Sequence, residues 1–366
     1  MKPAERFLAC LRYQPFDRPP YLEWWGPWES TLRNWMRETG LPREKLLAYR
    51  DEMDAVVETD LDFAFLPAFQ PALLSADEQY EVRRDRMGLT YRIFSQNPET
   101  SMPEFLSFPV RSVADWQALK LRLDPTLAER YPADWPVQVA AWQRDRPIVR
   151  LCGHSGSLYW GLSLFGFCRT MLGDEEVLYA FYDQPAMIHD MLETITTFNI
   201  TVIQRALREA PVSWVQIWED MCYKAGPLIS PAMFRAFLLP CYRRITDAIH
   251  QAGVDIIMVD SDGDVAELLP LWLEAGISGV YPMEQAAGND LFAYRARYGR
   301  NLLMYGGIDK RVLAMDHAAI ERELRAKIPL AWEGGYIPTH DHTIPSDVSY
   351  ANYMYYLELK RKLLEM

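Results

Sequence analysis

The residues best suited to chemistry lie in one short stretch near the end of the chain, Gly334–Pro345. Two of the six histidines, His340 and His342, flank Asp341 there. The stretch opens with glycines and apolar residues, a pattern typical of a buried strand. Histidine side chains placed just after a strand could transfer protons or bind a metal ion. We therefore expect His340 and His342 to be catalytic.

Further ionisable residues follow other apolar runs. Asp260 and Asp262 come directly after Ile256–Val259, and Glu284 follows a later run. Strand ends of this kind meet at the mouth of a barrel, where catalytic residues gather. Asp260, Asp262 and His342 could form a metal site with oxygen and nitrogen ligands. A metal-free acid–base cluster, with Glu284 as a catalytic residue, fits the same residues, and the sequence leaves both open.

Two more strand ends offer polar side chains. Glu219 and Asp220 follow the run Trp214–Ile217. Adjacent carboxylates can share a proton or bind a substrate, or one of them can cap a helix. We expect Asp220 to be catalytic and Glu219 to bind substrate. His154, in a glycine-rich segment after Ile148–Leu151, could donate to a substrate oxygen or belong to a tight structural turn.

An aromatic segment follows the first apolar run. Trp24, Trp25 and Trp28 lie there beside Glu23. Tryptophan rings could enclose the apolar part of a substrate. The same rings could instead pack as a plug inside the barrel.

The elements that must position these residues are short apolar runs separated by amphipathic helical patterns, such as Pro185–Ala210 and Pro231–Gln251. Alternating strands and helices predict a parallel sheet. Eight runs predict one (β/α)8 TIM barrel over residues 1–366. The runs are Tyr21–Trp24, Phe63–Leu66, Ile148–Leu151, Trp214–Ile217, Ile256–Val259, Gly279–Tyr281, Leu302–Tyr305 and Tyr336–Pro338.

Residues 70–146 exceed one strand-to-helix turn of such a barrel. Within them, Tyr80–Val82 and Thr90–Phe94 flank Asp85–Gly88, which predicts a hairpin. We expect an elaborated connection between the second and third strands that covers the mouth, rather than a separate domain.

Composition narrows the function classes. The 366 residues carry a net charge of −12, which disfavours nucleic acid as a partner. Five scattered cysteines without a paired motif indicate a reducing compartment. The sequence shows no signal-peptide pattern and no apolar stretch of about 18 residues. We therefore expect a soluble cytoplasmic protein that acts on a small molecule without a membrane.

The chain resembles the uroporphyrinogen decarboxylase-like superfamily. The resemblance rests on Arg6–Leu11 followed by Asp17–Pro20, the hairpin at Asp85–Gly88, the turn Gly307–Asp309 and the closing segment Gly335–Pro345. It covers nearly the whole chain and implies a TIM barrel whose pocket lies at the strand carboxyl ends. Dimers are common in the superfamily, so the resemblance also implies a possible homodimer.

One branch of the superfamily contains uroporphyrinogen decarboxylases. They use no cofactor, hold the porphyrinogen with an arginine-rich N-terminal loop and need an aspartate after the second strand. In this chain the loop Glu23–Glu29 is aromatic and acidic, and Phe69 falls where the aspartate is expected. His342 matches the late histidine of the family in the pattern His-x-Ile-Pro. An acidic pocket would repel a substrate with eight carboxylates.

The other branch contains cobamide-dependent methyltransferases, which exchange a methyl group with a corrinoid carried on a partner protein. Their zinc is bound by a His-x-Cys-Gly motif after the fifth strand and by a later cysteine. Those positions match Asp260–Gly263 and His342 here. The resemblance therefore implies a divalent metal, zinc by analogy, on Asp260, Asp262 and His342, and a corrinoid-binding partner protein.

Taken together, these observations predict a metal-dependent methyltransferase that works with a corrinoid partner on a small methylated substrate. One alternative is a cofactor-free decarboxylase of a porphyrinogen or of a smaller acid. Another is a non-catalytic barrel that binds a tetrapyrrole or corrinoid.

Overall fold

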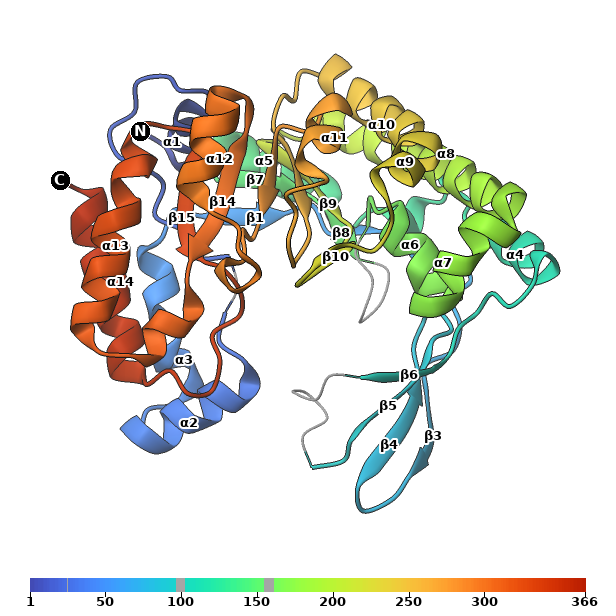
Figure 1. Ribbon diagram of the computed structural model, residues 1–366, viewed down its shortest axis with the longest axis horizontal. Coiled ribbons are helices and arrows are strands. Elements are labelled where there is room, and N and C mark those ends of the chain that lie inside the picture. The colour runs from blue at the N-terminus through green and yellow to red at the C-terminus, as the bar shows by residue number, and fades with distance from the viewer. Residues whose placement is uncertain (25, 97–102, 155–160) are drawn as a thin grey trace.

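The computed structural model describes residues 1–24, 26–96, 103–154 and 161–366. Its centre is a curled sheet of seven parallel strands, with helices packed around its outer side (Figure 1). In spatial order the strands are β1 (Val56–Glu58), β7 (Ile148–Leu151), β9 (Trp214–Trp218), β12 (Ile257–Asp260), β13 (Gly279–Tyr281), β14 (Leu303–Ile308) and β15 (Tyr336–His340). This α/β architecture is TIM-like, as the alternating pattern predicts, but the curled sheet of the described residues has seven paired strands rather than the eight expected.

The helices are amphipathic and bury their apolar stripe against the sheet. Both predicted long helices are present, although a π-helical turn at Phe234–Leu238 interrupts the second one. The helices are α1 (Pro3–Leu11), α2 (Glu29–Thr39), α3 (Arg43–Leu46), α4 (Val113–Leu119), α5 (Trp135–Asp145), α6 (Phe165–Leu172), α7 (Asp174–Asp183), α8 (Pro185–Glu209), α9 (Pro231–Met233), α10 (Leu239–Gln251), α11 (Leu269–Glu274), α12 (Leu291–Tyr298), α13 (His317–Trp332) and α14 (Tyr350–Leu364).

Strand alternation separates two apolar clusters. Residues on one side of the strands form a cluster within the curve of the sheet, including Ile148, Trp214, Met258, Tyr281 and Tyr305. Their neighbours along each strand pack beneath the helices in a larger core. Because successive side chains point to opposite faces, every second residue near a strand end faces the mouth and the others face the helices.

The second predicted strand is wrong in position. The structure places the strand at Val56–Glu58, whereas Phe63–Leu66 lies in the loop beyond it. Phe63 and Phe65 are nevertheless fully buried in the larger core. The apolar run therefore reflects packing of a loop rather than ladder hydrogen bonding.

The first predicted strand, Tyr21–Trp24, is also not a strand in the structure. Backbone amides that would donate to backbone carbonyls in a strand ladder donate here to side-chain carboxylates. The amide of Tyr21 donates to Asp54 Oδ2 at 2.9 Å, and the amide of His340 donates to Glu23 Oε2 at 3.2 Å. The segment thus lies along β15 on one side and near the start of β1 on the other, and it occupies the seam of the curled sheet.

The predicted hairpin between the second and third strands is confirmed. It belongs to a four-stranded antiparallel sheet that projects from the body of the molecule (Figure 1). Asp85 accepts the amides of Met87 and Leu89 in the turn, and Gly88 takes a positive φ of 93°. A role for residues 70–146 as a cover over the mouth stays a prediction. The strands are β3 (Ala72–Ala76), β4 (Tyr80–Arg84), β5 (Thr90–Phe94) and β6 (Glu104–Ser107).

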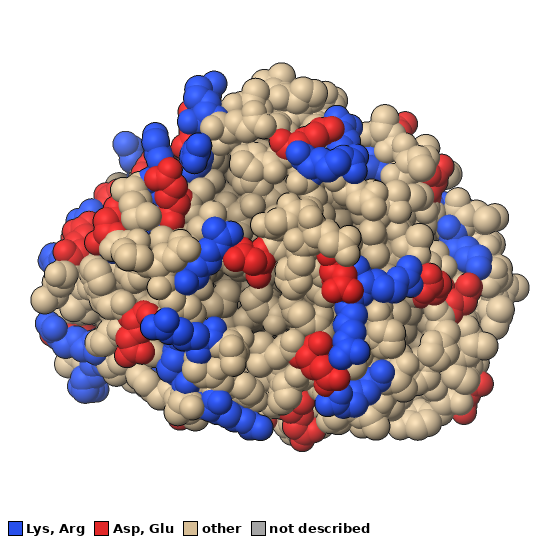
Figure 2. All heavy atoms as spheres, turned by 90° about the horizontal axis from the view of Figure 1, so that it is seen from above, with Lys and Arg blue, Asp and Glu red and all other residues tan. Residues whose placement is uncertain are grey.

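Three short pairings and the surface complete the description. Strand β2 (Leu61–Asp62) pairs with β8 (Gly153–His154), and β10 (Cys222–Tyr223) pairs with β11 (Gly226–Pro227). All five cysteines are buried and free. On the face seen in Figure 2, Lys and Arg side chains are interspersed with Asp and Glu. No helix of the described ranges is both long enough and apolar enough to cross a membrane.

Candidate functional site at the strand ends

The structure brings Asp262 and His342 together at the carboxyl ends of β12 and β15. Asp262 Oδ2 lies 3.4 Å from His342 Nε2, and the two side chains are 41% and 24% exposed. The Trp28 ring lies 6.4 Å from the imidazole, between ring centres. A carboxylate beside a partly exposed imidazole orients the ring and stabilises its protonated form. This pair can therefore hold and release a proton at the mouth.

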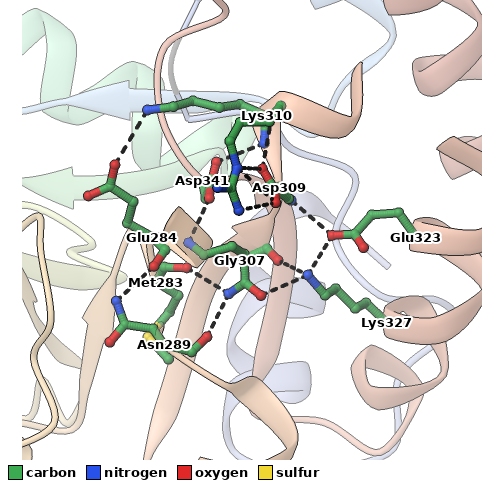
Figure 3. Close-up of polar contacts among 11 residues, drawn as sticks. Met283, Glu284, Asn289, Gly307, Asp309, Lys310, Glu323, Lys327 and Asp341 are labelled. Atoms are coloured by element: carbon green, nitrogen blue, oxygen red, sulfur yellow. Dashed lines mark hydrogen bonds and ion pairs between the residues drawn. The ribbon is translucent and has the colours of Figure 1, made fainter. Parts of the chain in front are cut away.

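A cavity of about 220 Å³ adjoins Asp262. Glu284 lies in its wall. Its contacts link the loops that follow three strands, and Figure 3 shows the one with Lys310. Its Oε2 accepts the amide of Gly263 at 3.2 Å, and its Oε1 lies 3.5 Å from Lys310 Nζ. The cavity is lined by Cys222, Tyr223, Lys224, Asp262, Gly263, Glu284, Ala286 and Ala287.

Asp341, between the two histidines, is buried and holds neighbouring loops together. It accepts the amides of Gln285 at 2.8 Å and Lys310 at 2.9 Å (Figure 3). Burial raises the pKa of its carboxyl to about 6. Behind it, Lys327 donates to the Gly307 carbonyl at 2.7 Å and to Gln285 Oε1 at 2.9 Å. These contacts fix the loops that carry Glu284 and Lys310.

Asp260 lies deeper than Asp262 and is 5% exposed. Its Oδ2 accepts the side-chain amide of Gln216 at 3.1 Å. Burial, and then the charges of Asp262 and Asp220, raise its pKa well above the ordinary value of an aspartate.

The three predicted metal ligands do not form a metal site as they stand. Asp262 contacts His342, but Asp260 is engaged with Gln216. Across the part of the chain that the structure describes, no three His, Cys, Asp or Glu side chains are grouped so that they could hold an ion. The donors present therefore do not fit the zinc that the sequence suggests, and zinc has no part in the mechanism proposed below.

His340 lies on the other side of β15 from the mouth. Its ring is fully buried, with Glu23 Oε2 at 3.2 Å from Nε2, and its Nδ1 donates to the His342 carbonyl at 2.7 Å. Glu23 in turn accepts from Lys360 at 2.5 Å and from Tyr356 at 2.6 Å, both on α14. Burial lowers the pKa of His340. The structure therefore does not bring the imidazoles of His340 and His342 together.

The adjacent carboxylates of Glu219 and Asp220 also lie in different surroundings. Glu219 is completely buried and accepts the amides of Leu164 at 2.8 Å and Gly166 at 2.9 Å, at the start of α6. Burial raises its pKa to about 7. Asp220 has a positive φ of 43° and pairs with Arg169 at 2.8 Å. Glu219 thus occupies the helix-capping position that the sequence left open as an alternative to substrate binding.

The tryptophans predicted to bind substrate also differ in their surroundings, since one is packed in the interior and another lies at the mouth. The Trp24 ring packs within the curve of the sheet, 4.9 Å from the Tyr281 ring between centres. This matches the plug alternative, whereas Trp28 lies beside His342. Trp25 lies outside the described residues. His154 ends β8 opposite Asp62, and its side chain is not among the described groups.

Glu58 and Asp60 are two carboxylates at the mouth that the sequence did not predict, because it placed the second strand too late in the chain. The strand ends at Glu58, so the aspartate that follows it is Asp60, which is exposed and has a positive φ of 50°. Phe69, expected to occupy that place, lies further on and packs against Phe65. Two adjacent β-branched residues, Val56 and Val57, directly before Glu58 were the available signal of a strand.

Known proteins resemble the chain in sequence and in fold. The profile of the uroporphyrinogen decarboxylase (URO-D) family matches residues 164–363, more than half of the chain. The chain belongs to this family. Uroporphyrinogen decarboxylase of Xanthomonas axonopodis pv. citri is 26% identical over 336 residues, covering 87% of this chain and 85% of that protein.

A second sequence relative and one solved structure also resemble the chain. The chloroplastic uroporphyrinogen decarboxylase of Zea mays is 25% identical over 183 residues, which is 49% of this chain and 44% of that protein. The chain thus spans about half of that relative. A methyltransferase from Methanosarcina mazei has the same fold, with a TM-score of 0.63, 15% identity and 99% of both chains covered.

Proposed function

We propose that the chain is an enzyme of this family that transfers a methyl group between a small methylated substrate and a corrinoid carried by a partner protein. The pair of Asp262 and His342 carries the proposal. It lies at the strand ends where the methyltransferases that the sequence resembles place their activating group. The shared fold with a methyltransferase agrees with it.

The residues present can perform the protein's part of such a transfer. The corrinoid supplies the centre that takes the methyl group. As the bond from the methyl carbon to the substrate heteroatom breaks, the electron pair stays on the heteroatom. His342 then donates its Nε2 proton there, and Asp262, 3.4 Å away, stabilises the imidazolium before transfer. Trp28 would exclude water from that side of the imidazole.

The charges at the mouth favour a small substrate over a porphyrinogen. Lysine and arginine side chains there already contact carboxylates: Arg169 with Asp220, Lys310 with Glu284, and Arg150 with Glu58. A substrate with eight carboxylates needs several cations that are free to bind it.

Decarboxylation of a carboxylic acid is the second candidate, and Asp60 favours it. The sequence relatives are named as decarboxylases. The resemblance described above implies that such enzymes need an aspartate after the second strand. Asp60 occupies that place. In this version Asp60 stabilises positive charge on the substrate, and His342 transfers the proton that replaces the carboxyl group.

Two assays on the purified protein separate the candidates. In the first, methanol, anisole or trimethylamine is the methyl donor and reduced cobalamin is the acceptor. The methylcobalamin that forms is followed by absorbance. In the second, carbon dioxide release is measured from uroporphyrinogen and from small acids. The proposal expects methylcobalamin with wild type and with His317→Ala, an exposed histidine on α13, but not with His342→Ala. Carbon dioxide release alone would contradict methyl transfer, and tight cobalamin binding without either activity would indicate a binding protein.

A further inference from the structure

Arg150 is the one buried arginine on a strand of the curled sheet, within the described residues, and it is 6% exposed. It follows Ile148 by two positions on β7, so it faces the inside of the curve with that residue. Its Cζ lies 3.6 Å from the centre of the Trp24 ring and 5.9 Å from that of Trp214. A guanidinium between aromatic rings is held in place while its edge stays able to donate.

The hydrogen bonding of this guanidinium is incomplete. One nitrogen, Nη2, pairs with Glu58 Oε1. The other Glu58 oxygen is 3.6 Å from the Cys152 thiol, so Glu58 is engaged at both ends. Nε and Nη1 are buried and have no hydrogen-bond partner among the residues that the structure describes. Leaving donors of a charged group unsatisfied in this way is costly, which points to a missing acceptor.

Two neighbouring groups on β9 are unsatisfied in the same sense. Trp214 Nε1 and Gln216 Oε1 have no partner in the described ranges. Trp214 is opposite Arg150 in the ladder, and Gln216 is the next residue of that strand on the same face. The group therefore offers cationic donors, one neutral donor and one acceptor between aromatic rings.

We propose that Arg150 binds the carboxylate of a small planar acid, whose planar part would lie beside the Trp24 and Trp214 rings. A carboxylate supplies the acceptors that Arg150 and Trp214 lack, and a single free edge of one arginine matches one carboxylate rather than eight. Gln216 Oε1 would accept from a hydroxyl or amide of the ligand. The inference deepens the proposed function by naming its substrate class, and it rests on that function only for the position of the substrate at this mouth.

Binding of two matched pairs of probes tests the inference without turnover. Benzoate is compared with benzamide, and propionate with propionamide, by calorimetric titration of the full chain. Each pair differs in charge but little in shape. We expect at least one acid to bind about tenfold or more tightly than its amide, because hydrogen bonds to a charged group are strong.

Variants assign that preference to Arg150. Arg150→Met should remove it, and Arg150→Lys should keep part of it. Arg144→Met, at an arginine that is 72% exposed, should behave as wild type. Glu58→Gln should strengthen binding of the acid, because it removes the neighbouring negative charge. If Arg150→Met does not fold, the Arg150→Lys and Glu58→Gln variants still decide the test.

Three outcomes overturn the inference: wild type that binds acid and amide equally, wild type that binds neither acid up to about 10 mM, or a preference that survives in Arg150→Met. Methyl transfer without a preference for acids would leave the proposed function standing and remove this inference. Binding of the acid without methyl transfer would do the reverse.

Discussion

His340 and His342 stand two residues apart and share almost nothing in their surroundings. His342 is 24% exposed and contacts Asp262 at the mouth. His340 is fully buried behind β15 and contacts Glu23. Strand β15 ends at His340 and the chain then bends, so the two imidazoles leave the strand in different directions. Closeness in sequence therefore says little about a shared site where a strand ends.

The carboxylates that face the two histidines differ in the same sense. Asp262 is 41% exposed, whereas Glu23 is 2% exposed and accepts hydrogen bonds from Lys360 and Tyr356. An exposed pair can exchange protons with a substrate and with water. A buried carboxylate that accepts hydrogen bonds from several donors stabilises one arrangement of the chain and costs much to disturb.

The largest effect should come from the exposed histidine. His342→Asn should lower the rate of methyl transfer about 10²- to 10⁴-fold, because it removes the proton donor, while thermal unfolding stays close to wild type. His340→Asn should instead lower the unfolding temperature and leave the rate per folded molecule within a few fold. Equal loss of activity in both variants would erase the distinction between the two histidines.

The buried carboxylate should dominate stability. Glu23→Gln leaves Lys360 buried without a counter-charge, so we expect a loss of about 3–5 kcal/mol in the free energy of unfolding. Urea denaturation at neutral pH measures it. A change below about 1 kcal/mol would mean that water or another group compensates Lys360.

Glu219 should reveal its burial through pH. Its folded pKa is about 7, above the ordinary value of 4.5, so the folded state binds the extra proton between these pH values. Its contribution to stability is then fully present below about pH 4.5 and falls by about 3 kcal/mol as the pH rises to 7. Glu219→Gln should remove this slope from urea denaturation curves, and Glu175→Gln, on the exposed side of α7, should keep it. An unchanged slope in Glu219→Gln would place the titrating group elsewhere.

The smallest effect concerns the neighbour of Lys360 on α14. Arg361 pairs with Glu52, whose side chain is 60% exposed. Glu52→Gln should change the free energy of unfolding by about 0.5 kcal/mol or less, because solvent screens the pair. The same urea experiment that tests Glu23→Gln checks it. A loss similar to that of Glu23→Gln would show that position along α14, rather than burial, sets the energy.

Much of the fold follows from the sequence, because parallel strands buried on both faces read as apolar runs. Ile148–Leu151 and Gly279–Tyr281 are strands with the predicted bounds. The second strand was missed because Val56–Glu58 is partly exposed and ends in an acidic residue, whereas the loop Phe63–Leu66 is more apolar. Periodicity reports burial, and it does not distinguish a buried loop from a strand.

The site was predicted less completely for a related reason. The pairing of Asp262 with His342 agrees with the expectation that strand ends converge. The burial of His340 and Glu219 depends on which face each side chain takes after the strand. Glu23 decides this for His340 and the start of α6 decides it for Glu219, and both partners lie far away in the sequence. Arg150 was overlooked because nothing in its local sequence marks the stacking on Trp24.

The contacts of Lys360 also bear on how the protein is made. Lys360 donates to the Leu22 carbonyl at 2.6 Å and to Glu23, so the seam of the sheet depends on residues 337 positions apart. During synthesis the first residues leave the ribosome long before Lys360 exists, and the Glu23 carboxylate has to wait in water for its counter-charge. The seam can therefore close only after translation has passed α14, and ribosome-bound chains that stop before it should stay sensitive to protease near residues 21–24.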